Sequence, residues 1–281
     1  MILLRRTFVA GAAACIATAT VSRTLAMPAR LRFAGAVTQG GLVVGTAAHA
    51  TPGTVDGQPV RVDKDGMFAF GFAFDQTKPA HVVAVYTDGG KDEQDVAPEV
   101  RHYEVQSVTG LPSETVSPSA EEQARIDREH ALVAKARQTD SDYAWFAEKF
   151  DWPAKGPISS PFGSQRELNG VKQAPHYGVD IAVGAGTPIH APTGGRVAVA
   201  EEFFLEGGYT MLDHGHGVFS GYMHQSKQLV KAGDMVERGQ VIGHVGKTGR
   251  ATGPHLHWAL NWFQVRLDPS LSARSPTPDK A

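Results

Sequence analysis

The pattern of apolar and polar residues first predicts a region of short strands. From residue 33 to residue 110, runs of valine, phenylalanine and alanine are separated by Gly-Gly, Pro-Gly and Asp-Gly pairs. Runs of this kind, bounded by turn residues, are typical of β-strands. In the run MFAFGFAF at 67–74, strand geometry would place the four phenylalanines on one face. About seven such strands fit the region, and we expect an immunoglobulin-like β-sandwich over residues 33–110.

A different pattern follows at residues 111–150, which we interpret as a linker and a helical segment. Proline and serine dominate the first residues of the segment. Ser119 and Glu122 then have the spacing of a capping box, and apolar residues recur at helical spacing in the charged run behind them. A second short helical piece, YAWFAEKF, is expected at 143–150. Two interpretations of it stay open: it packs onto a neighbouring domain, or it shapes or blocks one end of an active-site groove.

The pattern returns to strands in the C-terminal part of the chain, at residues 151–271. Valine-rich runs alternate there with glycine turns, and helical periodicity is absent. The runs predict five strands, at 195–202, 209–215, 218–224, 240–246 and 255–261. We expect an antiparallel β-sandwich domain with a groove over one sheet. A disordered tail is expected at 272–281. The fold class predicted for the whole chain is all-β.

The first 26 residues carry an export pattern. Arg5 and Arg6 precede an alanine-rich apolar stretch, and a cleavage-site pattern ends at Ala26 or at Ala29. The stretch is too short and too weakly apolar for a durable membrane span. We therefore expect a signal peptide at 1–26, of the twin-arginine or the general secretory type. The mature protein is expected in the periplasm or cell envelope, without a stable membrane anchor.

Cysteine content and net charge exclude some structural and functional classes. The single cysteine, Cys15, lies inside the predicted signal, so no disulfide supports the mature fold. Without residues 1–26 the chain keeps 24 basic and 29 acidic residues, a net charge of −5. This balance argues against nucleic-acid binding, which relies on a basic surface. The sequence carries no signal for an oligomeric state.

Candidate chemistry is concentrated in three short segments of the C-terminal block. APHYGVDIA carries His176 and Asp180, SGYMHQS carries His224, and TGPHLHWAL carries His255 and His257. Side chains two residues apart in a strand point to the same face, so His255 and His257 should lie together. Imidazoles and a carboxylate form a donor set for zinc, which in hydrolases takes three protein ligands and leaves one position for water. The residues predict a metallohydrolase.

These segments and their surroundings resemble the lysostaphin/LytM-type zinc endopeptidases of bacterial cell walls. The resemblance rests on FGSQR, HYGVDIA, GTPIHAPTGGRV, LDHGHG, GYMH and VKAGDMVERGQVIGHVGKTGRATGPHLHW, in that family's order and spacing. It implies the duplicated hybrid motif fold and one zinc ion per chain, bound by His176, Asp180 and His257. It also implies that His224 and His255 are catalytic. Which of the two is the base, and which stabilises the oxyanion, stays open.

The resemblance further implies a secreted zinc metalloendopeptidase that hydrolyses the peptide cross-links of peptidoglycan, with peptide stems as its partner. Which cross-link is cut stays open. One alternative is a non-catalytic relative that activates another wall hydrolase. A second is a carrier domain, because VKAGDMVERGQVIGHV is similar to the repeat of biotinyl and lipoyl domains. Of the other histidines, His190 and His244 are expected to be structural. His214 and His216 should flank a hairpin turn, from which one of them could line the cleft.

Overall fold

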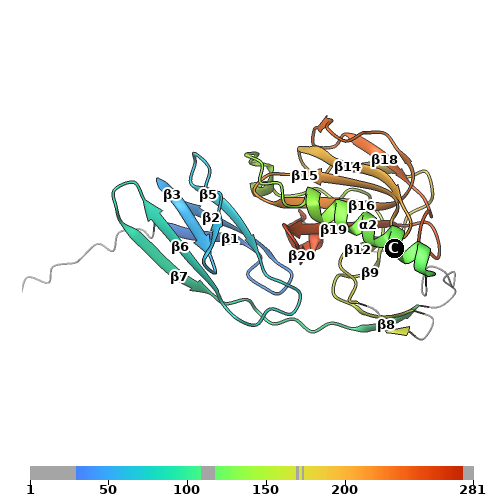
Figure 1. The fold of residues 1–281 in the computed structure, drawn as a ribbon, viewed down its shortest axis with the longest axis horizontal. Helices are drawn as coiled ribbons and strands as arrows, with labels where there is room; N and C mark the ends of the chain where they lie inside the picture. Colours follow the sequence, from blue (N-terminus) through green and yellow to red (C-terminus); the bar gives the residue numbers. More distant parts are fainter. Residues whose placement is uncertain (1–29, 109–117, 169–170, 173, 275–281) are drawn as a thin grey trace, which may run out of the picture.

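In the computed structural model, the described residues are 30–108, 118–168, 171–172 and 174–274. Strands dominate these residues, and nearly all of them pair in antiparallel fashion, which confirms the predicted all-β class (Figure 1). Within these ranges no helix has both the length and the apolar character needed to cross a membrane. The predicted signal at 1–26 and most of the predicted tail lie outside the described residues.

The N-terminal lobe consists of two antiparallel sheets that share one core (Figure 1). One sheet has the order β1 (Leu31–Gly35), β2 (Leu42–Ala47), β5 (Met67–Gly71), and the other has the order β4 (Gln58–Val60), β3 (Ala50–Val55), β6 (Ala80–Tyr86), β7 (Lys91–Val96). The core between the sheets contains Val43, Phe68, Phe70, Val82 and Tyr86. The lobe is therefore a β-sandwich. Its immunoglobulin-like character stays a prediction.

One of the four phenylalanines at 67–74 does not join this core. β5 ends at Gly71, and Phe72 still packs with Phe68 and Phe70. Phe74 instead stacks on Tyr103, with ring centroids 4.3 Å apart, and packs against the core of the C-terminal lobe. The expectation of one shared face was wrong for Phe74, because the strand ends before it and the alternation of faces ends with the strand.

The last strand of the region 33–110 does not join the sandwich. β8 (Val105–Val108) pairs in parallel with β10 (Gln165–Leu168), and β11 (Val171–Lys172) completes this small sheet. Figure 1 shows the extended stretch after β7 that carries β8 away from the N-terminal sheets. Apolar alternation identifies a strand, but it does not identify the strand's partner.

The predicted capping box is confirmed, and it starts α2 (Ala120–Ala136). The Glu122 backbone N–H donates to the Ser119 hydroxyl, and the Ser119 backbone N–H donates to the Glu122 carboxylate. α2 lies across the C-terminal sheet (Figure 1) and packs Val133 against Tyr209, Met211 and other side chains on that face.

The C-terminal lobe is built on one ten-stranded sheet, which follows the order β17-β14-β15-β16-β19-β12-β9. β18 pairs with β16 and β13, and β20 pairs with β19. The strands are β9 (Ile158–Ser160), β12 (Val179–Ile181), β13 (Pro188–His190), β14 (Gly195–Phe203), β15 (Gly207–Asp213), β16 (Val218–Gln228), β17 (Met235–Val236), β18 (Val241–Val245), β19 (Leu256–Trp262) and β20 (Val265–Leu267). β14, β15, β16, β18 and β19 confirm the five predicted strands.

Both faces of this sheet are covered at its centre. Leu212, Tyr222 and Trp258 point into the main core on one face, whereas Met211 and Phe219 point to the face under α2. β15 is consequently buried along its whole length. Because Trp258 enters the main core, the neighbouring residue in β19 must face the side on which α2 lies. This alternation positions the candidate site.

The segment 143–150 packs against the C-terminal lobe. It contains the 3₁₀ turn η1 (Trp145–Ala147), and Phe146 and Phe150 are both buried in the main core. Of the two interpretations of this segment, packing onto a neighbouring domain rather than shaping the groove describes these two side chains. The Phe150 N–H donates to the Ser272 carbonyl, and the Arg274 N–H donates to the Phe150 carbonyl. The chain thus stays paired with the lobe beyond the predicted limit at 271, after the short helix α3 (Pro269–Ser272).

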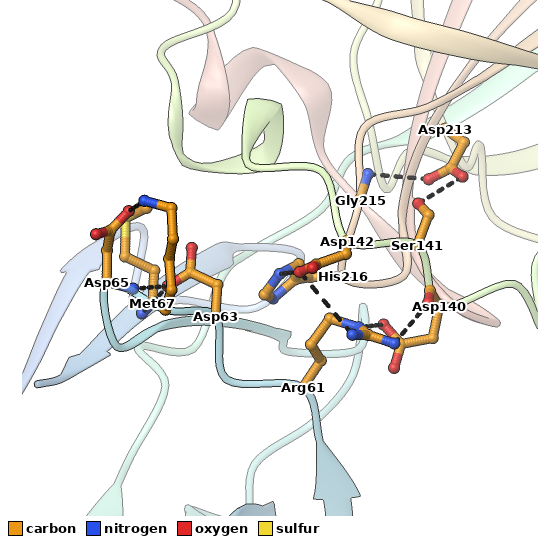
Figure 2. Close-up of polar contacts among 11 residues, drawn as sticks. Arg61, Asp63, Asp65, Met67, Asp140, Ser141, Asp142, Asp213, Gly215 and His216 are labelled. Atoms are coloured by element: carbon orange, nitrogen blue, oxygen red, sulfur yellow. Dashed lines mark hydrogen bonds and ion pairs between the residues drawn. The ribbon is translucent and has the colours of Figure 1, made fainter. Parts of the chain in front are cut away.

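Polar contacts join the two lobes. Arg101 forms an ion pair with the buried Asp268 at 2.9 Å, and the Asp268 N–H donates to the Gly40 carbonyl. A second contact is shown in Figure 2, where Arg61 of the N-terminal lobe reaches Asp140 at 2.9 Å, close to the ring of His216. The proposed boundary between the lobes is therefore crossed by charge-assisted hydrogen bonds as well as by apolar packing.

Candidate metal centre

Three donor atoms converge where β12 and β19 pair. The register of these strands places Asp180 opposite His257, and His176 precedes β12 on the same side. Asp180 Oδ1 lies 2.8 Å from His257 Nδ1 and 3.0 Å from His176 Nε2. The two nitrogen atoms are 2.9 Å apart. The structure thus brings together the three residues that the resemblance implied as ligands. Within the described ranges they form the one group of this kind that could share a metal ion.

The donor set fits zinc. Tetrahedral zinc with bonds of about 2.0–2.2 Å to nitrogen and oxygen requires donor atoms about 3.3 Å apart. The observed separations of 2.8–3.0 Å are close to that spacing. The orientation of the His176 ring is fixed on the side away from the donor cluster, where its Nδ1–H donates to the Pro161 carbonyl at 3.1 Å. This bond leaves the lone pair of Nε2 directed at the cluster, as is usual for histidine ligands.

Asp180 supplies negative charge to this cluster. Burial alone would raise the pKa of its carboxyl, but hydrogen bonds with His176 and His257 hold that pKa well below the usual range. The carboxyl group is therefore ionised at neutral pH. A buried carboxylate beside two imidazoles favours a cation at the point where the three side chains meet.

His224 and His255 lie beside the donor atoms, with ring centroids 4.7 Å apart. The Nδ1–H of His224 donates to the Thr248 carbonyl at 2.8 Å, and the Nδ1–H of His255 donates to the Gly253 carbonyl at 2.9 Å. In a neutral imidazole the other nitrogen is then a proton acceptor. His255 Nε2 lies 3.8 Å from Asp180 Oδ1. Both rings therefore present an acceptor nitrogen, and that of His255 points towards the cluster.

The backbone at His224 is unusual. Its φ of 62° is in the left-handed region, which costs free energy for a residue other than glycine and is found most often at functional sites. The His224 N–H donates to the Glu206 carbonyl at 2.8 Å, which helps to hold this conformation. Burial, reinforced by the neighbouring His255, lowers the pKa of His224 to about 3. The ring is therefore neutral at physiological pH.

A cavity of about 220 Å³ opens over the candidate metal centre. His176, His224 and His257 line it on the sheet side. The remaining lining comes from α2 and from loops and strands around the sheet: His130, Ala174, Pro175, Tyr177, Leu205, Glu206, Met223, Arg250 and Arg266. The cavity can hold part of an extended peptide against the donor atoms.

Comparison with known sequences points to one family. The profile of peptidase family M23 matches residues 174–269. The peptidoglycan DD-endopeptidase ShyA of Vibrio cholerae is 41% identical over 114 residues, which make up 40% of this chain and 26% of that protein. An uncharacterized metalloprotease of Haemophilus influenzae is 47% identical over 133 residues, 44% of this chain and 28% of that protein. The chain thus spans about a quarter of the length of these curated relatives.

A solved structure extends the match beyond the metal centre. A Pseudomonas aeruginosa protein assigned to peptidase M23 is 32% identical, with a TM-score of 0.66. The match covers 84% of this chain and 94% of that one. The chain belongs to peptidase family M23. Membership of this family excludes the carrier-domain alternative. The match to the solved structure includes the N-terminal lobe as well as the peptidase lobe.

Four acidic or basic residues that line the groove of this M23 protein were not predicted from its sequence: His130, Glu206, Arg250 and Arg266. They come from a helix, a turn, a loop and a short strand, and none lies in a spacing that marks a metal or catalytic site. The one available signal was a charged residue inside a short apolar strand, VRL, which contains Arg266. A charge in that position is commonly solvated, so the pattern alone does not identify it.

The remaining histidines of the C-terminal lobe, His190, His214, His216 and His244, lie away from the M23 groove. His214 is fully buried, and its Nδ1–H donates to the Gly194 carbonyl at 2.7 Å. His216 is buried and stacks on Phe146 at 4.3 Å. His190 and His244 lie in the paired strands β13 and β18. None of the four is among the residues that line the cavity over the metal centre, so the expectation that His214 or His216 could line the cleft is not met there.

Proposed function

We propose that this M23 protein is an exported zinc endopeptidase that hydrolyses peptide cross-links of bacterial peptidoglycan. The observation that carries the proposal is the convergence of three donor atoms within 3.0 Å of one another under a groove. Membership of a peptidase family supports peptide hydrolysis. The name of the relative ShyA, a peptidoglycan DD-endopeptidase, supports the wall peptide as substrate.

His176, Asp180 and His257 hold one zinc ion per chain in this proposal. When bound, zinc acidifies a water molecule to a pKa near 7 and polarises the scissile carbonyl group. Asp180 contributes its negative charge, and the Pro161 carbonyl fixes the orientation of His176. These two features favour a divalent cation at the point where the three side chains meet.

His255 is the proton acceptor for the attacking water. Its Nε2 carries no proton when the ring is neutral, because the Nδ1–H is committed to Gly253. Its side chain is 17% exposed, so the ring can hold a positive charge after it accepts the proton. Protonated at Nε2, the same ring can then donate to the leaving amine, as a general base does when it becomes a general acid.

His224 is assigned a positioning role beside the reacting groups. Burial disfavours its charged form, and the hydrogen bond to Thr248 keeps the proton on Nδ1. Its Nε2 can accept a hydrogen bond from the water or from a substrate N–H. It cannot donate one to an oxyanion unless the tautomer changes. This tautomer supports a water-orienting role for His224 over an oxyanion role.

The non-catalytic alternative is less well supported. A chain that serves only as an activator has no need for a complete set of donors and acceptors. Here the three donor residues and the two flanking histidines are all present and close together. We further propose that residues 1–26 direct export to the periplasm or cell envelope, and that the N-terminal lobe, the helical segment and the peptidase lobe are separate units of the chain.

The proposal is tested by digestion of purified wall sacculi with the zinc-loaded chain lacking residues 1–26. Mass analysis of the released muropeptides should show cross-linked dimers replaced by monomers, and the masses identify the bond that is cut. The His255→Ala variant is the control for contaminating hydrolases. An unchanged cross-linked fraction would contradict the proposal. Stimulation of a second, added wall hydrolase in the same assay would favour the activator function instead.

A further inference from the structure

The groove over the metal centre adjoins a second cavity that lies under α2. This cavity has a volume of about 210 Å³. It shares His130, Glu206, Met223 and Arg266 with the cavity over the metal centre. Its remaining lining is formed by Val133, Ala134, Arg137, Tyr209 and Gln264. A peptide bound over the donor atoms therefore has room to extend towards α2, and Arg266 stands at the junction.

Arg266 faces the groove as a cation that forms no ion pair with a described acidic residue. Its neighbour Leu267 is fully buried in the main core, so alternation along β20 turns Arg266 to the opposite side. The guanidinium carbon lies 5.9 Å from the centroid of the Tyr177 ring, beside the ligand His176. Burial lowers the pKa of Arg266 to about 10, so the group is still charged at neutral pH. Among the described residues, its guanidinium makes no hydrogen bond or ion pair.

A second guanidinium lies next to it. Arg137 is 3% exposed, and its Nε has no hydrogen-bond partner among the described residues. The charge of Arg137 opposes that of Arg266 strongly enough to contribute to the lowered pKa of Arg266. Among the described residues, Glu206 is the one acidic residue that lines either cavity. It pairs with His130 at 3.5 Å, and its charge acts to raise the pKa of Arg266. The described lining of the second cavity therefore carries two guanidinium groups against one carboxylate, and that carboxylate is already paired with His130.

A structural role explains only part of this arrangement. Arg137 is the C-cap residue of α2, where a cation is favoured by the helix dipole. The dipole does not explain a second desolvated guanidinium beside it, because like charges repel and unpaired buried charges cost free energy. A carboxylate would offset both costs. Guanidinium groups bind carboxylates in bidentate fashion, with short charge-assisted hydrogen bonds.

We propose that Arg266, supported by Arg137, binds a carboxylate of the peptide substrate while the scissile bond lies over the metal centre. The inference rests on the proposed function and deepens it. It makes Arg266 a specificity-determining residue that favours peptides with a free carboxylate over their amidated forms. The carboxylate is either the chain end of a stem peptide or that of one of its acidic residues.

Binding of three matched peptides tests the proposal. The probes are an uncross-linked stem tetrapeptide with all its carboxylates free, the same peptide amidated at its C-terminus, and the same peptide amidated at its acidic residue. Isothermal titration calorimetry with the zinc-loaded chain should show about 10-fold or greater weakening for one amidated form. The form that is weakened identifies which carboxylate Arg266 binds.

Variants separate recognition from a structural role. Arg266→Gln should bind the three peptides with equal affinity, and Arg266→Lys should keep part of the preference because it keeps the charge. Arg128→Gln is the matched control, since Arg128 is an exposed arginine on α2 that lines neither cavity. If Arg266→Gln does not fold, two measurements still test the carboxylate site: binding of the three peptides to the unaltered chain, and binding of the same peptides to Arg137→Gln.

The outcomes also distinguish this inference from the proposed function. Equal binding of all three peptides to the unaltered chain, or binding of none, overturns the inference even if sacculi are digested. Equal loss of affinity for all three peptides in Arg266→Gln indicates a structural role and overturns it too. If sacculi are not digested but the acid peptide binds better than an amidated form, the carboxylate site stands and the proposed function fails. In cross-link hydrolysis, Arg266→Gln should raise KM more than it lowers kcat.

Discussion

Lowering the pH from 8 to 5 should destabilise the fold through His214, a histidine outside the groove. Its side chain is fully buried. The Nδ1–H donates to the Gly194 carbonyl at 2.7 Å, and Nε2 accepts from the Ser220 hydroxyl at 2.7 Å. Both ring nitrogens are therefore satisfied in the neutral form. A charged ring would be desolvated without a carboxylate in hydrogen-bond contact, which is unfavourable.

The size of the effect follows from the pKa of this ring. Burial lowers the pKa of His214 from 6.5 to about 4. The unfolded chain therefore takes up the proton first as the pH falls. The stability that the neutral ring contributes is present above pH 6.5 and is lost progressively down to pH 4. Between pH 8 and pH 5, protonation of this ring raises the equilibrium constant for unfolding by a factor of about 30. This corresponds to a loss of about 2 kcal/mol of stability, and the full loss at lower pH is about 3 kcal/mol.

The assay compares urea unfolding of the unaltered chain and of His214→Asn at pH 8, 7, 6 and 5, with chelator present so that metal binding does not contribute. The variant should be less stable at pH 8, because it loses packing and hydrogen bonds. The stability difference between the two proteins should shrink by about 2 kcal/mol by pH 5. Other titrating groups, including His216, are common to both proteins and cancel in this difference.

A stability difference that stays constant between pH 8 and pH 5 would refute the reasoning. If His214→Asn does not fold, NMR titration of the histidine rings in the unaltered chain gives the same information. The ring of His214 should show no protonation above about pH 5. A ring assigned to His214 that titrates near pH 6.5 would mean that burial does not control its charge.

Three further outcomes are expected. His257→Ala should lose the bound zinc by elemental analysis, because two of three protein ligands remain, and full occupancy in this variant would exclude His257 as a ligand. His255→Ala and His224→Ala should keep zinc but lose activity by about 100-fold or more, and loss of zinc in either would make that residue a ligand. Arg101→Ala should lower the free energy of unfolding by about 2 kcal/mol or more in urea, because it leaves the buried carboxylate of Asp268 without its ion pair. An unchanged midpoint would show that this contact between the lobes is energetically neutral.

Much of the local structure could be predicted because its signals are local. The five strands predicted in the C-terminal block correspond to β14, β15, β16, β18 and β19, since a period of two and glycine turns are visible in a short window. Ser119 and Glu122 marked the start of α2 for the same reason, as a capping box involves residues three apart. The same alternation buries Trp258 fully in the core, opposite the face that carries His257.

Pairing and packing between distant segments left no such signal. The sequence marks β8 as a strand, but its pairing with β10 depends on where an extended stretch carries it. Phe74 looked like a member of the sandwich face and packs instead on Tyr103. The groove residues His130 and Arg266 lie more than a hundred residues apart and meet only because α2 lies across the sheet.

The sequence by itself therefore determined the all-β class and the start of α2, because each depends on residue type and short spacing. The candidate donors were implied by the resemblance to the lysostaphin/LytM-type endopeptidases. The tertiary structure decided that the donor atoms of His176, Asp180 and His257 lie within 3.0 Å of one another. It also decided that His214 is neutral and that the guanidinium of Arg266 stands beside that of Arg137. These properties depend on distances between remote segments and on exclusion of water, and neither is encoded in the local order of residues.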